Sequence, residues 1–84
     1  MNARHGKTLA AIFRQSTPAN VEWAAIEALL LSVGCTLIEG QGSRVRFVTE
    51  TMIETFHRPH PAKEAKRYQV RAARDYLIRL GVTP

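Results

Sequence analysis

The fold of this chain is decided by residues 26–49, which read IEALLLSVGCTLIEGQGSRVRFVT. The first part of this stretch holds four apolar residues at spacings of three and four, namely Ile26, Leu29, Leu30 and Val33. That spacing is typical of a helix with one buried face. Beyond Gly34, where the helix is expected to stop, the apolar period changes to two, as in strands. The stretch therefore predicts a helix followed by a sheet, with Asn20 available as the N-cap of the helix.

Three strands are predicted after this helix. We expect them at Cys35–Glu39, Ser43–Thr49 and Met52–His57. Gly40-Gln41-Gly42 supplies a flexible turn between the first two strands, and a short turn around Glu50 connects the last two. Because the connections are short, neighbouring strands are expected to run antiparallel.

The second strand has one apolar face and one basic face. Val45 and Phe47 point to one side of the sheet, whereas Arg44 and Arg46 point to the other. A sheet that is buried on one face would therefore present guanidinium groups on its open face, an arrangement that suits phosphate. The third strand leaves its inward face undecided, because each of its sides carries one apolar and one polar residue.

Two further helices flank this pattern. A short helix is predicted over Lys7–Arg14 and a last helix over about Ala65–Leu80, with Gly81 at its end. The apolar stripe of the last helix consists of Val70, Ala73, Leu77 and Leu80. Without the short first helix the order is α-β-β-β-α, an α+β fold in which helices cover one face of a three-stranded antiparallel sheet. This dsRBD-like order is the layout of double-stranded-RNA-binding domains.

Length and charge narrow the class of protein. We expect 84 residues to form a single domain over 1–84 with one small core. The formal charge of +5 favours anionic partners, nucleic acid first. No apolar run is long enough to cross a membrane or to form a signal-peptide core, so we expect a cytoplasmic protein without membrane contact. Cys35 is the only cysteine, which excludes an internal disulfide and a thiolate metal cluster, and we expect it to be buried.

The segment Phe56–Glu64 carries the residues suited to chemistry. It contains His57 and His60 together with Arg58 and Lys63. Histidine is the side chain that exchanges protons near neutral pH, and arginine binds phosphate bidentately, so the segment is equipped for RNA cleavage. The alternative is that these histidines are only polar residues of a turn rich in proline. No metal site and no cofactor are expected, because no partner at ligand spacing accompanies the histidines.

Three motifs in this order resemble those of the HicA toxins, small ribonucleases of bacterial type II toxin–antitoxin pairs, and especially those of a variant subgroup with Gly-Ser-Arg and His-Arg-Pro-His-Pro. They are Thr17–Asn20, Gly42–Val45 and Phe56–Pro61, and the likeness runs from about Lys7 to Pro84. The resemblance implies a dsRBD-like fold, cleavage of mRNA without a metal cofactor, and inhibition by a HicB antitoxin.

One residue departs from the family pattern. HicA toxins of the best-known type carry a catalytic histidine directly after Gly-Ser, where this chain has Arg44. Arginine cannot accept a proton at neutral pH, so any general base must come from elsewhere. His60 matches a histidine that many members carry before the last helix, His57 lies on a neighbouring strand, and His5 in an N-terminus expected to be frayed is a third candidate.

We therefore predict His60 as the general base, with His57 acting as the acid or orienting the substrate phosphate. Six cations are predicted to bind RNA, namely Arg44, Arg46, Arg58, Lys63, Lys66 and Arg67. Two alternatives remain open: a catalytically inert RNA-binding module of the same fold, and a basic protein that works only through a protein partner. For Trp23 we favour the core over a partner interface.

Overall fold

The computed structural model describes residues 1–84 and contains three helices and three strands. They follow one another as α1 (Ala3–Ile12), α2 (Trp23–Ser32), β1 (Thr36–Glu39), β2 (Arg44–Val48), β3 (Ile53–His57) and α3 (Arg67–Arg79). The predicted α-β-β-β-α order with an additional N-terminal helix is thus confirmed.

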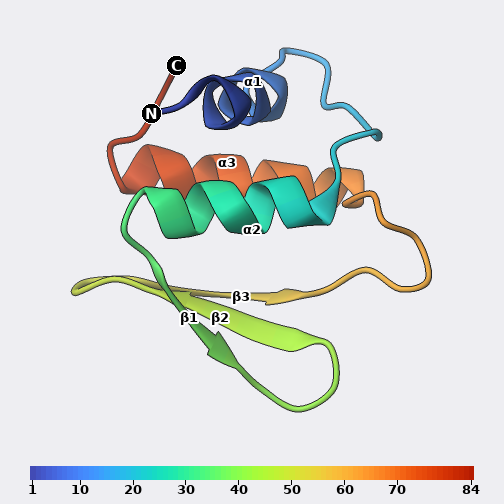
Figure 1. The fold of residues 1–84 in the computed structure, drawn as a ribbon, viewed down its shortest axis with the longest axis vertical. Coiled ribbons are helices and arrows are strands. Elements are labelled where there is room, and N and C mark those ends of the chain that lie inside the picture. Colours follow the sequence, from blue (N-terminus) through green and yellow to red (C-terminus); the bar gives the residue numbers. More distant parts are fainter.

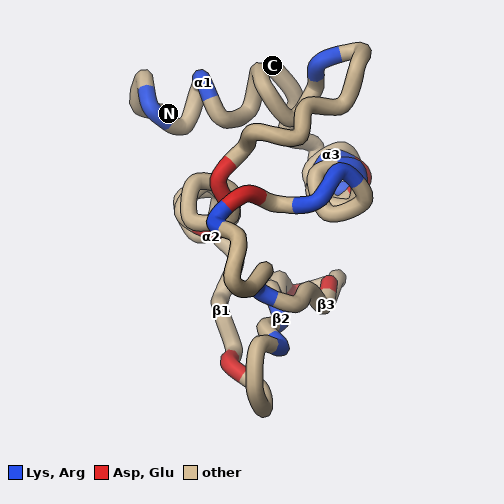
Figure 2. Tube along the Cα trace, turned by 90° about the vertical axis from the view of Figure 1, so that its right-hand side faces the viewer, with Lys and Arg blue, Asp and Glu red and all other residues tan.

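The elements form three layers (Figure 1). The helices α2 and α3 lie side by side on one face of the sheet, and α1 lies on their other side, away from the sheet. Figure 2, a view at right angles, shows α2 and α3 nearly end-on between α1 and the strands. The opposite face of the sheet is covered by no element of the chain.

The sheet is antiparallel with the order β1-β2-β3. In the pairing of β2 with β3, Arg44 lies opposite His57, and Arg46 lies opposite Thr55. Directly opposite residues of neighbouring strands share a face. The register therefore places His57 beside Arg44 on one face of the sheet.

The two faces of β2 are as the sequence predicts, with Val45 and Phe47 fully buried and Arg44 and Arg46 exposed. The structure also resolves the undecided third strand. Phe56 is buried, whereas Ile53 is 63% exposed and His57 is exposed, so Phe56 faces the helices. On the inward face, the Phe56 ring packs against that of Phe47, with 5.8 Å between the ring centroids.

Trp23, Phe47 and Phe56 form an aromatic cluster between α2 and the sheet. Trp23 is 5% exposed, and its ring centroid lies 6.3 Å from that of Phe47 and 5.2 Å from that of Phe56. Tilted aromatic pairs at such separations stabilise by about 0.5–1.5 kcal/mol each beyond the area that they bury. The prediction that Trp23 belongs to the core is confirmed.

Tyr76 connects α3 to the sheet from within the core. Its hydroxyl donates to the backbone oxygen of Phe47 at 3.0 Å and accepts from the Cys35 thiol at 3.8 Å. Burial, followed by the contact with Cys35, raises the pKa of Tyr76 to about 12. Burial likewise raises the pKa of Cys35, which is buried as predicted.

The predicted starts of all three helices are wrong. The N-terminus is not frayed: α1 begins at Ala3 rather than Lys7, because the Asn2 side chain accepts from the His5 amide at 2.8 Å and caps the helix. Asn20 does not cap α2, whose N-cap residue Glu22 makes no capping hydrogen bond with its side chain. The Trp23 amide instead donates to the backbone oxygen of Lys63 at 2.9 Å.

The contact between Trp23 and Lys63 belongs to a short antiparallel pairing. Because of this pairing, α3 begins later in the chain than predicted. The Ala65 amide donates to the backbone oxygen of Val21 at 2.8 Å, so the chain stays extended there and the helix begins at Arg67 instead of Ala65. The predicted stops of α2 at Gly34 and of α3 at Gly81 are confirmed, whereas α1 ends at Ile12 instead of the predicted Arg14. Gly34 and Gly81 follow α2 and α3 with φ of 106° and 80°, a region that favours glycine. None of the helices has the length and apolar character needed to span a membrane.

Candidate functional site

The open face of the sheet brings Arg44 and His57 together. They are directly opposite residues at the end of the β2–β3 pairing, and both are exposed. The Ser43 hydroxyl lies 3.4 Å from Nδ1 of His57, and Arg46 occupies the next position on the same face of β2. Imidazole, hydroxyl and two guanidinium groups thus gather at one end of the sheet. Figure 2 shows that no helix covers this face of the sheet.

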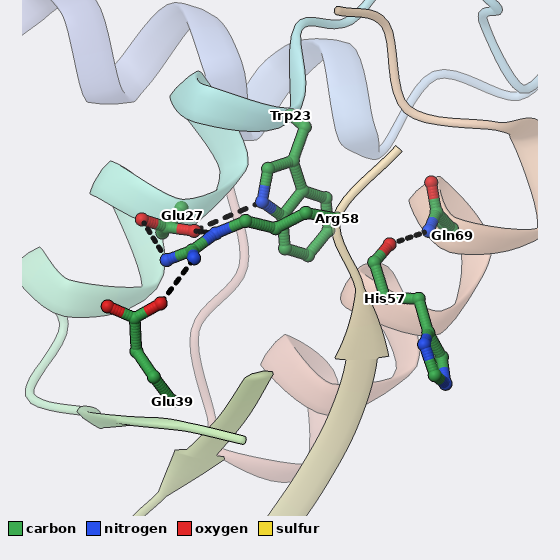
Figure 3. A network of polar contacts seen from close by, with 6 residues as sticks. All are labelled: Trp23, Glu27, Glu39, His57, Arg58 and Gln69. Carbon is green, nitrogen blue, oxygen red and sulfur yellow. Dashed lines mark hydrogen bonds and ion pairs between the residues drawn. The ribbon is translucent and has the colours of Figure 1, made fainter. Parts of the chain in front are cut away.

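The backbone of His57 is held from two sides. Nε2 of Gln69 donates to the His57 carbonyl oxygen at 2.7 Å, and the Arg58 amide donates to the Ser43 carbonyl oxygen at 2.8 Å. Gln69 is 2% exposed, and its Oε1 accepts from the Lys66 amide at 3.0 Å. One buried side chain therefore joins the first turn of α3 to the last residue of β3 (Figure 3).

Arg58 lies on the other side of β3 and is engaged with carboxylates. Its Nε and one terminal nitrogen contact the two oxygens of Glu27 at 3.1 and 3.3 Å, and its other terminal nitrogen contacts Glu39. Trp23 Nε1 also donates to Glu27, at 3.0 Å. The hydrogen bonds with Glu27 and Glu39 raise the pKa of Arg58. Figure 3 shows its side chain and that of His57 pointing in different directions.

The structure separates Arg58 from the two arginines of β2, with which it was predicted to bind RNA. Because two carboxylates already take its hydrogen-bond donors, its observed contacts are those of a residue that ties β3 to α2 and β1. Neither Glu27 nor Glu39 stood out in the sequence, since Glu27 lies 31 residues and Glu39 lies 19 residues from Arg58.

His60 lies in the loop between β3 and α3, three residues beyond His57. The chain bends at His60 and Pro61, and the imidazole of His60 is exposed. Three residues of chain span at most about 10 Å, so His60 remains near the end of β3. His5 is excluded from this neighbourhood, because α1 lies on the far side of α2 and α3.

The remaining predicted cations gather at the start of α3. Lys63, Lys66 and Arg67 are all exposed, although Nε of Arg67 donates to the backbone oxygen of Thr17 at 3.2 Å. Figure 2 shows this segment running from α2 to the start of α3, with basic residues at both ends. No group of three or more His, Cys, Asp or Glu residues is placed to hold a metal ion.

Comparison with known families identifies the chain. Residues 23–82, from the first residue of α2 to beyond α3, match the family described as the HicA toxin of bacterial toxin–antitoxin systems. The chain belongs to the HicA toxin family. It is therefore the toxin of such a system, and an antitoxin is implied as its partner. Comparisons with curated proteins and with solved structures give no match.

The family match does not cover the whole of the earlier resemblance. The helix α1 and the Thr17–Asn20 motif precede the matched residues, whereas Gly42–Val45 and Phe56–Pro61 lie within them. Arg44, which stands where the resemblance places a histidine, therefore lies inside the matched region of this HicA toxin.

Proposed function

We propose that this HicA toxin is a metal-independent endoribonuclease that cleaves mRNA in the cytoplasm and is neutralised by a HicB-type antitoxin. The family supports a ribonuclease, and the charge of +5 suits an RNA substrate. The site is the end of the open sheet face around Arg44 and His57, with His60 nearby in the following loop.

The observation that carries the proposal is the pairing of Arg44 with His57. Residues directly opposite in an antiparallel sheet have Cβ atoms roughly 5 Å apart. The imidazole of His57 can therefore reach nearly the same point above the sheet as would the imidazole of a histidine at position 44. We assign the general base to His57 and the acid to His60, which reverses our sequence-based order, since His57 is the one fixed by the sheet.

The Ser43 hydroxyl can either accept from or donate to Nδ1 of His57, and the proposed reaction uses the arrangement in which it accepts. When Nδ1 carries the proton and donates to the Ser43 hydroxyl, Nε2 has a free lone pair and is the basic atom. Nε2 removes the proton from a ribose 2′-OH, and the oxygen attacks the adjacent phosphorus. The P–O5′ bond then breaks as His60, the general acid, protonates the departing oxygen. The products are a 2′,3′-cyclic phosphate and a 5′-OH end.

The guanidinium groups have a different task in this reaction. Arg44 and Arg46 stabilise the charge that develops on the non-bridging phosphate oxygens, and they hold the RNA backbone against the sheet. Lys63, Lys66 and Arg67 extend the phosphate-binding surface from the loop to the start of α3. Arg58 contributes indirectly, by fixing the end of β3 through Glu27 and Glu39.

A second candidate function is an RNA-binding module without catalysis. It is favoured by the replacement of the expected histidine by Arg44 and by the absence of a carboxylate that would orient either His57 or His60. Such a protein would bind RNA through the same arginines but leave it intact.

Cleavage of a defined RNA by the purified toxin in EDTA tests the proposal. We expect products with cyclic phosphate ends, and His57→Ala should lower the rate by about 10²–10⁴, with a large loss also for His60→Ala. His5→Ala is the matched control and should cleave normally. Intact RNA with the unaltered toxin would favour the binding module, and 3′-OH products or dependence on added metal would overturn the mechanism.

A further inference from the structure

A cavity of about 300 Å³ opens between the start of α2 and the loop that follows β3. Its apolar wall includes Ala24 of α2 and the rings of Pro59 and Pro61, and Trp23 forms part of its lining. The cavity also borders Arg58, the residue after His57. The side chains of Arg58 and His57 point in different directions, so the cavity lies on the other side of β3 from the proposed general base.

The walls of this cavity are fixed by backbone hydrogen bonds. The Trp23 amide donates to Lys63 and the Ala65 amide donates to Val21, so a short antiparallel pairing joins the two sides. Arg58 is held in addition by its carboxylate partners. A cavity with such walls exists before any ligand arrives, as is usual for binding sites of small molecules.

Its size and lining suit a single nucleobase. A volume of about 300 Å³ lies at the lower end of small-molecule sites, too small for a duplex. Apolar and proline surfaces can pack against the flat face of a base, and RNA is read with sequence specificity mainly through unpaired bases. Two further lining residues, Glu22 and Lys63, supply a carboxylate and an ammonium group.

These two charges distinguish among the bases. Guanine presents N–H donors on one edge, which suit a carboxylate, and the acceptors O6 and N7 on another, which suit an ammonium group. Adenine and cytosine carry an amino group but not the O6 and N7 acceptor pair, and uracil has no exocyclic amine. We propose that this cavity binds an unpaired guanine of the RNA substrate and sets the sequence preference of the toxin, an inference that rests on the proposed ribonuclease function.

Trp23 allows the binding to be measured without cleavage, because it is the only tryptophan of the chain and lines the cavity. Guanosine 5′-monophosphate should change its fluorescence and bind at least about tenfold more tightly than the other three mononucleotides. Filling the cavity by Ala24→Leu should weaken this binding about tenfold. Ala10→Leu, at an exposed position of α1, is the matched control and should bind as the unaltered protein does.

Glu22→Gln is a second test that does not depend on filling the cavity. The Glu22 side chain makes no capping hydrogen bond, so the variant is expected to keep its fold, which circular dichroism checks. It should lose most of the preference for guanosine monophosphate over the other mononucleotides. Equal binding of all four mononucleotides, or unchanged guanine binding in both folded cavity variants, would overturn the proposal.

Cleavage of an RNA with randomised bases gives an independent readout. We expect guanine to be enriched at one fixed position relative to the cut for the unaltered toxin and for Ala10→Leu, and this enrichment to be lost for Ala24→Leu. A cut pattern without guanine enrichment would also overturn the proposal. If the toxin cleaves no RNA, the proposed function fails, and the fluorescence titration still decides whether the cavity binds guanine.

Discussion

Replacing Gln69 by glutamate tests how the site is held, because it changes a donor into an acceptor with almost no change in shape. The Gln69 side chain accepts from the Lys66 amide and donates to the His57 carbonyl oxygen at 2.7 Å. In Gln69→Glu the first contact survives. The second becomes a contact between two acceptors at a position that is 2% exposed in the unaltered protein.

The expected cost follows from this geometry. An unsatisfied buried acceptor costs roughly 1–3 kcal/mol, and the buried negative charge adds to it. We expect the free energy of unfolding at pH 7 to fall by about 2–3 kcal/mol. For a domain of this size, each kcal/mol corresponds to roughly 4–8 °C in the melting temperature. The melting temperature should therefore fall by about 8–24 °C.

The effect should depend on pH in a defined direction. Burial and the facing carbonyl raise the pKa of the introduced carboxyl group above its value in the unfolded chain. Its neutral form can donate to His57 again, so the penalty should be small in acid and should grow as the pH rises from the unfolded-state pKa to the higher folded-state pKa. Thermal melting at pH 4 and pH 7 measures the difference, with Gln15→Glu at an exposed loop position as the control.

The same variant tests the link to the site. At a temperature well below melting, the folded protein should cleave RNA with a lower kcat and a nearly unchanged KM, because the altered contact positions His57 rather than the RNA. A loss of stability that is equal at both pH values, or no greater than that of Gln15→Glu, would refute the reasoning. An unchanged kcat in the folded protein would show that the contact with Gln69 is structural only.

Two further predictions concern charge and ionisation. Arg44→Ala combined with Arg46→Ala should lower the slope of log affinity for RNA against log salt by about one to two units, because two phosphate contacts are lost, while thermal stability barely changes. The raised pKa of Tyr76, about 12, means that only the unfolded state ionises there between about pH 10 and pH 12. Stability should fall across this window by about 3 kcal/mol, at 1.36 kcal/mol per pKa unit, and Tyr76→Phe should remove that fall in denaturant titrations.

The chain offers a matched control for each of these predictions. Arg4→Ala with Lys7→Ala removes two charges from α1, on the side away from the sheet, and should leave most of the salt slope intact. Tyr68 is 56% exposed, so Tyr68→Phe should keep the alkaline loss of stability. A salt slope that falls equally in the Arg44/Arg46 variant and in the Arg4/Lys7 variant, or an alkaline loss that persists in Tyr76→Phe, would contradict the corresponding prediction.

The layered fold could be predicted from the sequence because the apolar period changes sharply at Gly34, from the helical spacing of α2 to the alternation seen in β2. The inward face of β3 could not be predicted. Phe56 and Ile53 compete for the core at opposite faces, and Glu54, which shares the face of Phe56, is tolerated there by an ion pair with Arg79 at 2.8 Å. That partner lies 25 residues away and carries no local signal.

The predicted helix starts were wrong for a related reason, namely contacts with residues far away in the chain. Asn20 is a good capping residue by type, but the first amide of α2 is satisfied by the backbone of Lys63, which any residue could supply. Gln69 was missed as a contact of His57 for the same kind of reason. Its side chain donates to a backbone carbonyl group, and because every residue has one, the sequence does not indicate which carbonyl group is the partner.

The pairing of Arg44 with His57 depends on register, which the residue types of β2 and β3 do not state. A motif read along one strand treats the missing histidine after Gly42-Ser43 as a lost function. Read across the sheet, the same surface still holds an imidazole beside a guanidinium group, with Ser43 in reach of Nδ1. Because opposite residues share a face, a catalytic histidine can lie on either strand of a pair. A site on an open sheet face is therefore better sought among cross-strand neighbours than at a single motif position.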